Sequence, residues 1–133
     1  MIPRRILTGV TAVVVEDHDD VRSLLTEFLR QQGARVIGCP NAAEALEAVT
    51  QELPDVVLSD INLPDVDGFQ LLQSIRRLDP EIGGSIPVIA MSALGATVTK
   101  QRALAAGFRS YLGKPFTPQQ LLQTIEAALR PET

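Results

Sequence analysis

Five short apolar runs alternate along the chain with five longer stretches of helical periodicity, and this alternation constrains the fold more than any other feature. The apolar runs are Ala12–Val15, Arg35–Cys39, Val56–Ser59, Ile86–Met91 and Ser110–Leu112. The first, third and fourth are continuously apolar, which is typical of central parallel strands covered on both faces. A strand–helix unit repeated five times predicts an α/β fold with a parallel sheet, helices on both faces and right-handed crossovers.

The stretches between the runs carry apolar residues at helical spacing, with start and stop signals at their ends. The signals are a stop at Gly33, a cap at Asn41 with Glu44 three residues later, a stop at Gly107, and a cap at Thr117 followed by Pro118 and Gln120. The fourth helical stretch, Thr97–Ala106, is alanine-rich and only weakly apolar. This weak pattern fits a helix that moves and fits equally well a helix that is merely exposed.

Size and composition indicate one ordinary globular domain of 133 residues, without an internal repeat or linker. A net charge of −4 argues against a nucleic-acid surface and gives no support to binding at anionic membranes. Cys39 is the only cysteine, which excludes an internal disulfide and favours a reducing compartment. The chain shows neither a convincing signal peptide nor an apolar stretch of roughly 20 residues, so we expect a cytoplasmic protein.

Polar side chains stand directly after four of the five apolar runs. Glu16 and Asp17 follow the first run, Asp60 the third, Ser92 the fourth, and Lys114 comes shortly after the fifth. Ligands of open α/β sheets bind beyond the carboxyl ends of the strands, at the point where the strand order reverses. We therefore expect these five side chains to gather at one edge of the sheet.

Three carboxylates at one edge repel each other unless a cation joins them. Mg²⁺ fits such a site, because it binds carboxylates, keeps several waters and contacts phosphate oxygens. Zinc is disfavoured, since His18 is the only histidine and Cys39 the only cysteine. A lysine and a hydroxyl at the same edge suit phosphoryl transfer, in which a carboxylate can itself become an aspartyl phosphate.

Each of these residues also has a purely structural interpretation. Acids that follow strands often cap the next helix, and this applies to Glu16 and Asp17 as much as a ligand role does. Further acids fit first-turn or turn positions: Asp19 and Asp20 in one helix start, Asp65 and Asp67 with Gly68 before another. Ser92 alone would be an ordinary strand-end hydroxyl, and Lys114 alone would be a solvated surface lysine. A single histidine such as His18 is more often exposed and without a function. The functional hypothesis rests on the joint placement.

Four motifs in order resemble the receiver domain of two-component response regulators: "VVVEDHDDVRSLL", "VVLSDINLPDVDGFQLL", "VIAMSA" and "YLGKPF". The similarity extends from about Ala12 to Leu129. It implies a flavodoxin-like (βα)5 sandwich with the strand order 2-1-3-4-5. We accordingly expect the domain at residues 11–130, with 1–10 as a leader or the tail of a preceding region and 131–133 as a C-terminal tail.

The resemblance also implies a role for each matching residue. Asp60 would be the phosphoacceptor. Mg²⁺ would be bound by Asp17, by Asp60, by the backbone carbonyl of Asn62 and by Glu16, the last through water or as part of the acidic pocket. Lys114 and Ser92 would contact the phosphoryl group, Tyr111 would swing as Ser92 moves, and the Lys114–Pro115 bond would be cis. Glu16 and Ser92 replace the aspartate and threonine of many relatives, and Leu94 and Asn62 match positions thought to tune phosphate lifetime. The role of His18 stays open.

The function implied is a phosphorylatable signalling receiver rather than a classical enzyme. A sensor histidine kinase or a histidine phosphotransfer protein would donate the phosphoryl group, slow self-dephosphorylation would follow, and a downstream protein would detect the change in shape. One alternative is a Mg²⁺-dependent phosphatase with an aspartyl nucleophile, although its general acid would be expected where Asn62 stands. A degenerate receiver that only binds a partner is another alternative, which the set Asp17, Asp60, Ser92 and Lys114 opposes.

Overall fold

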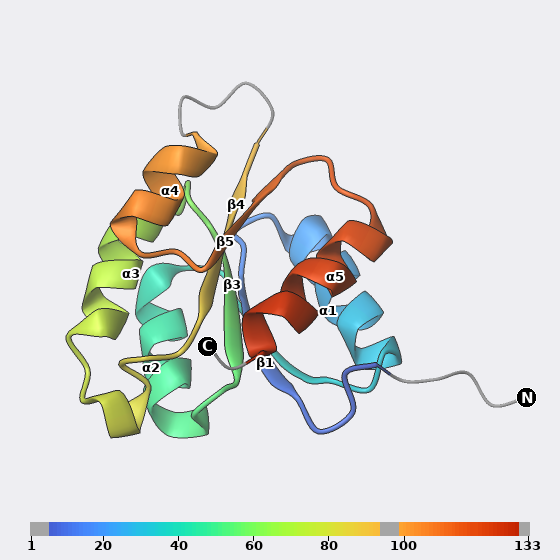
Figure 1. The fold of residues 1–133 in the computed structure, drawn as a ribbon, viewed down its shortest axis with the longest axis horizontal. Helices are drawn as coiled ribbons and strands as arrows, with labels where there is room; N and C mark the ends of the chain where they lie inside the picture. Colours follow the sequence, from blue (N-terminus) through green and yellow to red (C-terminus); the bar gives the residue numbers. More distant parts are fainter. Residues whose placement is uncertain (1–5, 94–98, 131–133) are drawn as a thin grey trace, which may run out of the picture.

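The computed structural model describes residues 6–93 and 99–130, which form one parallel sheet with helices on both faces (Figure 1). The strands are β1 (Thr11–Val15), β2 (Arg35–Cys39), β3 (Val56–Asp60), β4 (Val88–Ser92) and β5 (Ser110–Gly113). Their order in the sheet is β2-β1-β3-β4-β5, and every neighbouring pair is parallel. The predicted (βα)5 fold and strand order are confirmed.

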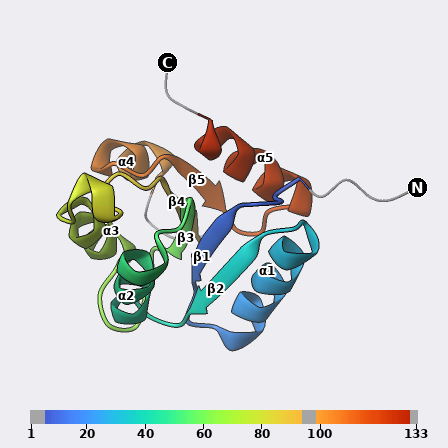
Figure 2. The ribbon, with the colours of Figure 1, turned by 90° about the horizontal axis from the view of Figure 1, so that it is seen from below.

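In the described residues, five α-helices cover the sheet in two layers, as Figures 1 and 2 show. They are α1 (Asp19–Gln31), α2 (Ala42–Glu52), α3 (Gly68–Arg76), α4 (Lys100–Ala106) and α5 (Pro118–Leu129), with a 3-10 turn at Pro80–Ile82. Helices α2, α3 and α4 lie on one face, and α1 and α5 lie on the other. Within the residues described, no helix is long and apolar enough to span a lipid bilayer.

The two faces of the sheet carry two separate clusters of buried side chains, because successive strand residues point to opposite sides. Val13 and Val15 of β1 pack into the cluster beneath α2, α3 and α4. Val14, the residue between them, packs into the cluster beneath α1 and α5. Residues of the central strands are therefore buried on both faces, which explains why their sequence runs are continuously apolar.

The helix ends follow the signals seen in the sequence. Thr117 and Gln120 form a reciprocal capping box at the start of α5, with Pro118 at the first helical position. Asn41 caps α2 by accepting the backbone N–H of Glu44. Gly107 ends α4 in the left-handed region at φ +112°. The predicted start of that helix at Thr97 lies outside the described residues, and Thr99 caps the described part.

Several strand ends differ from the predicted apolar runs by one or two residues. Strand β4 begins at Val88 instead of Ile86, since Pro87 has no N–H to donate to the ladder, although its carbonyl accepts from Val57. Within the predicted leader, Leu7 is 1% exposed, packs into the α1/α5 cluster and donates its backbone N–H to Gln32 O at 2.9 Å. Leu7 and Val10 thus pack against the domain, and the boundary at residue 11 stays a prediction.

Candidate functional site

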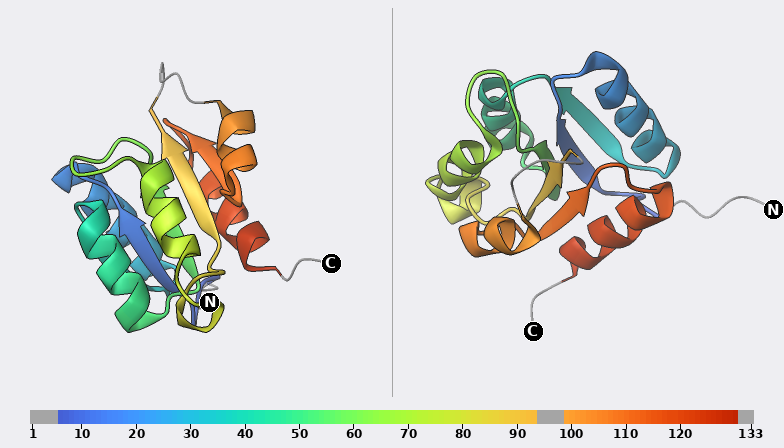
Figure 3. Two further views of the ribbon diagram at one scale, coloured as in Figure 1. Left: turned by 90° about the vertical axis from the view of Figure 1, so that its left-hand side faces the viewer. Right: turned by 90° about the horizontal axis from the view of Figure 1, so that it is seen from above.

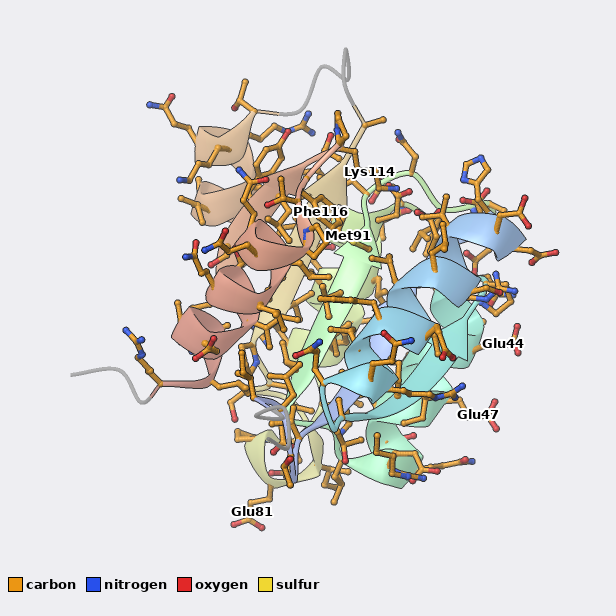
Figure 4. All side chains as sticks on the ribbon, turned by 90° about the vertical axis from the view of Figure 1, so that its right-hand side faces the viewer. Glu44, Glu47, Glu81, Met91, Lys114 and Phe116 are labelled. Atoms are coloured by element: carbon orange, nitrogen blue, oxygen red, sulfur yellow. The ribbon has the colours of Figure 1, made fainter. Side chains whose placement is uncertain are left out.

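The carboxyl ends of the parallel strands lie at one edge of the sheet (Figure 3), and the predicted site residues stand at or just after these strand ends. Glu16 and Asp17 directly follow β1, and Asp60 and Ser92 are the last residues of β3 and β4. Lys114 follows the last residue of β5, and its side chain lies at this edge in Figure 4. Because the three central strands are parallel and in register, these side chains arrive at the same level.

Lys114 is the electrostatic centre of the site. Its Nζ donates to Glu16 Oε1 at 2.5 Å and to Asp60 Oδ2 at 3.0 Å. The Glu16 side chain is 0% exposed, that of Asp60 7% and that of Lys114 22%. Burial alone lowers the pKa of Lys114, but the hydrogen bonds and charges of Glu16 and Asp60 outweigh it and raise the pKa above 10.5. One ammonium group therefore holds two buried carboxylates together.

The backbone around Lys114 fixes its position against the neighbouring strand. Its N–H donates to Ser92 O at 2.7 Å, which joins the end of β5 to the end of β4. The bond between Lys114 and Pro115 is cis, as the resemblance implied.

The loop after β3 folds back onto Asp60. Asp60 Oδ1 accepts the backbone N–H of Asn62 at 3.1 Å, and Gly68 donates its N–H to Ile61 O at 2.7 Å. A Cβ at position 68 would lie 2.8 Å from both Asp60 O and Ile61 Cα. Gly68 is thus required by a close backbone approach beside the carboxylate, a reason that its turn interpretation in the sequence did not include.

A second group of ligand atoms lies beside the first. Glu16, Asp17 and His18 each offer one potential metal-binding atom, all within 4.8 Å of one another. His18 Nδ1 is 3.2 Å from Glu16 Oε2 and 3.3 Å from Asp17 Oδ1. The pKa of His18 is raised above 6.5, first by the hydrogen bond to Glu16 and then by the charges of Asp17 and Glu16. Asp17 Oδ1 is buried and makes no hydrogen bond within the described part of the chain.

These groups fit a divalent cation. The donors are carboxylate oxygens, the chemistry that Mg²⁺ prefers. A buried carboxylate oxygen without a hydrogen bond, Asp17 Oδ1, is costly unless a cation or ordered water meets it. Asp60 is joined to the acidic pair through Lys114, which it shares with Glu16. The carbonyl of Asn62 as a ligand stays a prediction; the contact that the structure shows is from its N–H.

The two predicted switch residues lie on adjacent strands. The Ser92 hydroxyl is buried and makes no hydrogen bond with any residue described, so it is an available donor at the site. Tyr111 lies in β5 opposite Ala90 of β4 and packs, partly buried, against the α2/α3/α4 cluster. Leu94, which the resemblance linked to phosphate lifetime, lies outside the described residues. Movement of Ser92 and Tyr111 stays a prediction.

Sequence reasoning missed the role of Asp65, which it assigned to turn chemistry. Both carboxylate oxygens of Asp65 accept backbone N–H groups at the start of α2, from Ala42 and Ala43, each at 3.0 Å. Burial raises the pKa of Asp65, but these backbone hydrogen bonds outweigh it and hold the pKa below 3.8. The contact crosses more than 20 residues of sequence, so no local pattern reveals it. It ties the loop that follows Asp60 to the end of a helix.

A (βα)5 domain with an acidic pair, an aspartate and a lysine at the ends of parallel strands defines a class of signalling module in which an aspartate is phosphorylated. The chain belongs to the response regulator receiver domain family, whose profile matches residues 12–126.

The curated relatives include both short and long proteins. A 14.6 kDa protein of Leptolyngbya boryana is 38% identical over 120 residues, which is 90% of each chain. The transcriptional regulatory protein PrrA of Mycobacterium tuberculosis is 36% identical over 126 residues, but the chain spans only 52% of its length. The sensor histidine kinase RcsC of Salmonella typhi is 37% identical over 113 residues, 12% of that protein. The matched region thus makes up most of the first relative, about half of the second and a small part of the third.

Solved structures of receiver domains match the whole sheet. A response regulator from Chloroflexus aurantiacus is 32% identical with a TM-score of 0.82, covering 90% of this chain and 97% of that one. The receiver domain of the sensor histidine kinase PA1611 from Pseudomonas aeruginosa is 28% identical with a TM-score of 0.81, covering 92% and 98%. That structure has a magnesium ion coordinated in its active site cleft.

Proposed function

We propose that this domain receives a phosphoryl group on Asp60 in a Mg²⁺-dependent reaction and passes the signal on by changing shape. The observation that carries the proposal is the pair of contacts from Lys114 Nζ, to Asp60 Oδ2 and to Glu16 Oε1. These contacts place a nearly buried carboxylate nucleophile beside a cation and an acidic pocket. Family membership supports the reaction class.

In the proposed reaction, a carboxylate oxygen of Asp60 attacks the phosphorus of a phosphohistidine. The new O–P bond forms as the P–N bond breaks, and the imidazole leaves with the electron pair. The Asn62 N–H on Oδ1 and the Lys114 ammonium on Oδ2 orient the carboxylate. Reactions of this kind depend mainly on positioning and charge neutralisation, which these fixed donors supply.

Asp17, Asp60 and Glu16 are the side chains proposed to hold Mg²⁺, with the Asn62 carbonyl as a further ligand. The ion would neutralise charge on the phosphoryl oxygens. The support is the buried oxygen of Asp17 that makes no hydrogen bond within the described residues, and the magnesium ion in the related PA1611 structure. Lys114 uses Glu16 Oε1, and the other oxygen, Oε2, contacts His18 and is the one proposed to face an ion or its water.

The switch follows from the change in charge at Asp60. An acyl phosphate carries about two negative charges where the carboxylate carried one, and it adds three acceptor oxygens. Lys114 and the unpaired hydroxyl of Ser92 are the proposed donors to these oxygens. Tyr111, one strand away, is proposed to change position as Ser92 moves. The result is a population shift between two packings of the α4/β5 side of the domain.

The proposed phosphodonor is a sensor histidine kinase or a histidine phosphotransfer protein, and the partner downstream is another protein. The chain's net charge of −4 fits a protein partner better than nucleic acid. The cytoplasm is the proposed compartment, because Cys39 is a buried free thiol suited to reducing conditions.

Intact-mass spectrometry tests the acceptor assignment. Wild type, Asp60→Asn and the matched control Asp79→Asn are incubated with acetyl phosphate, with and without Mg²⁺. Asp79 is an exposed cap of the 3-10 turn, away from the site. We expect one added phosphoryl group on wild type and control, only with Mg²⁺, and none on Asp60→Asn. Equal labelling of all three proteins contradicts the assignment.

The same experiment separates the receiver from a phosphatase. A receiver takes up about one phosphoryl group per chain, whereas a phosphatase with an aspartyl nucleophile releases many phosphates from a free substrate. Sustained release of inorganic phosphate from a small phosphorylated substrate would therefore contradict the receiver function and support the phosphatase alternative. Lys114→Ala provides a further check: we expect it to bind metal but to lose most of the conformational response to phosphorylation.

A further inference from the structure

His18 is a potential ligand that the proposed phosphoryl transfer does not use. It is the only histidine of the chain and stands directly before α1. The residue occupies the N-cap position, yet its side chain makes no capping hydrogen bond. Its ring is instead turned toward the acidic pair, with Nδ1 at 3.2 Å from Glu16 Oε2 and 3.3 Å from Asp17 Oδ1. The orientation therefore has no local structural cause in the helix start.

We propose that His18 Nδ1, Glu16 Oε2 and Asp17 Oδ1 together bind a late first-row divalent ion such as Co²⁺, Ni²⁺ or Zn²⁺, and that His18 sets the preference over Mg²⁺. The inference rests on the metal site of the proposed function. It adds a nitrogen ligand that Mg²⁺ does not favour and that these ions do.

The distances fit one ion shared by the three atoms. Ligand bonds of about 2.0–2.1 Å place neighbouring donors about 2.9 Å apart in an octahedron and about 3.3 Å apart in a tetrahedron. The two distances from His18 Nδ1, 3.2 and 3.3 Å, match these ligand spacings. All three ligand atoms lie within 4.8 Å of one another, and the Asp17 side chain, 35% exposed, is free to close the remaining gap.

The partners of each oxygen also favour this assignment. Lys114 uses Oε1 of Glu16, so Oε2 is the oxygen that faces His18. Asp17 Oδ1 is buried and makes no hydrogen bond within the described residues, so an ion there would replace its 3.3 Å ion pair with His18 Nδ1 and no hydrogen bond. The His18 ring is 72% exposed, so it loses little packing when it turns to a metal and leaves coordination positions open to water. Without a metal, the same nitrogen forms an ion pair with the acids.

Cobalt is the probe of choice, because a single histidine makes its spectrum unambiguous. Tag-free wild type carrying ¹³C-labelled histidine is loaded with Co²⁺ and examined by ¹H and ¹³C NMR. A bound imidazole gives strongly hyperfine-shifted carbon-bound ring signals, which solvent exchange does not remove. We expect these signals in wild type and not in Asp17→Ala, which removes the ligand carboxylate. Unshifted ring signals in Co²⁺-saturated wild type overturn the inference.

Affinity measurements on His18→Gln provide the matching test. Groups that only orient a metal ligand typically contribute about 10–100-fold to metal affinity. Loss of the ligand itself should therefore weaken Co²⁺ binding at least about tenfold. Mg²⁺ affinity should change less than about threefold, since Mg²⁺ is held by oxygens and water. His18 is exposed, so the variant should keep its fold, which the NMR spectrum shows directly. An equal loss of affinity for both metals, or no loss for either metal, overturns the role of His18.

The outcomes also separate this inference from the proposed function. Asp60 could become phosphorylated with Mg²⁺ in both wild type and His18→Gln while wild type shows no preference for Co²⁺. This result refutes the nitrogen ligand and leaves the proposed function intact. Absence of any divalent binding refutes the nitrogen ligand and the Mg²⁺ site together.

Discussion

Replacing Lys114 by methionine tests the electrostatic arrangement most directly. The substitution removes the ammonium group that joins Glu16 and Asp60 and keeps a side chain of similar length. Both carboxylates then remain at the ends of β1 and β3 without their shared cation. We expect the folded protein to lose stability because two buried negative charges face each other.

The size of the loss follows from the contacts. Glu16 Oε1 and Asp60 Oδ2 lie 2.5 and 3.0 Å from the same Nζ, so they are at most about 5.5 Å apart. Two unit charges at that separation repel by about 3 kcal/mol at an effective dielectric constant of 20. Removing one partner of a buried ion pair typically costs about 3–5 kcal/mol. We therefore expect the free energy of unfolding to fall by about 3 kcal/mol.

Urea unfolding of wild type, Lys114→Met and Lys100→Met in metal-free buffer measures this loss. Lys100, the chain's other lysine, is exposed at the start of α4, so its substitution should change stability by less than about 0.5 kcal/mol. Mg²⁺ at ten times its Kd stabilises wild type by about 1.4 kcal/mol. It should stabilise Lys114→Met by more, since it replaces the missing cation. A loss below about 1 kcal/mol, or equal losses in both variants, refutes the reasoning.

Three further predictions concern single contacts. Gly68→Ala should lower the free energy of unfolding by about 1–3 kcal/mol in urea, because the added Cβ would lie 2.8 Å from Asp60 O. The same substitution should reduce the rate of phosphorylation, and an unchanged stability and rate contradict this prediction. Asp65→Ala should cost about 1 kcal/mol at pH 7 through the lost cap on α2. Because the folded-state pKa of Asp65 is lowered, the difference in unfolding free energy between wild type and Asp65→Ala should vanish as pH falls below 3.8. A difference in urea unfolding that does not depend on pH refutes this prediction. Burial raises the pKa of Cys39 to about 11, so a thiol reagent at pH 8 should label it only on unfolding, and rapid native labelling is the contrary result.

The fold was predictable because its signals are local and repeat. Each strand is a short apolar run, each helix has a periodic face, and glycine or a capping residue marks most ends. The strand end that moved most, at β4, depends on the missing N–H of Pro87, a detail that apolar periodicity does not contain. Strand order is not a local property, and the expected order 2-1-3-4-5 came from the resemblance.

The site was predictable only as a gathering of residue types. Parallel strand ends place Asp60, Glu16 and Lys114 at one edge, so their proximity follows from topology. The hydrogen-bond partner of each side-chain atom does not follow from topology. Lys114 bridging two acids, and Asp65 binding backbone amides more than 20 residues away, depend on side-chain directions that topology leaves open. His18 lies beside Asp17 in sequence, yet its turn toward the acids is equally invisible there.

The charges at the sheet edge connect the proposed metal binding with the proposed response to phosphate. Glu16, Asp17 and Asp60 carry three negative charges against the one positive charge of Lys114, so the set lacks two positive charges, which a divalent cation supplies. If Asp60 is phosphorylated as proposed, about one negative charge is added and balance is lost again. Lys114 donates to Glu16 and Asp60 and keeps one of its three N–H donors, and the Ser92 hydroxyl, which makes no hydrogen bond with any residue described, is a nearby neutral donor. The same shortage of positive charge that favours a metal would thus draw Lys114 and Ser92 toward the new phosphoryl oxygens.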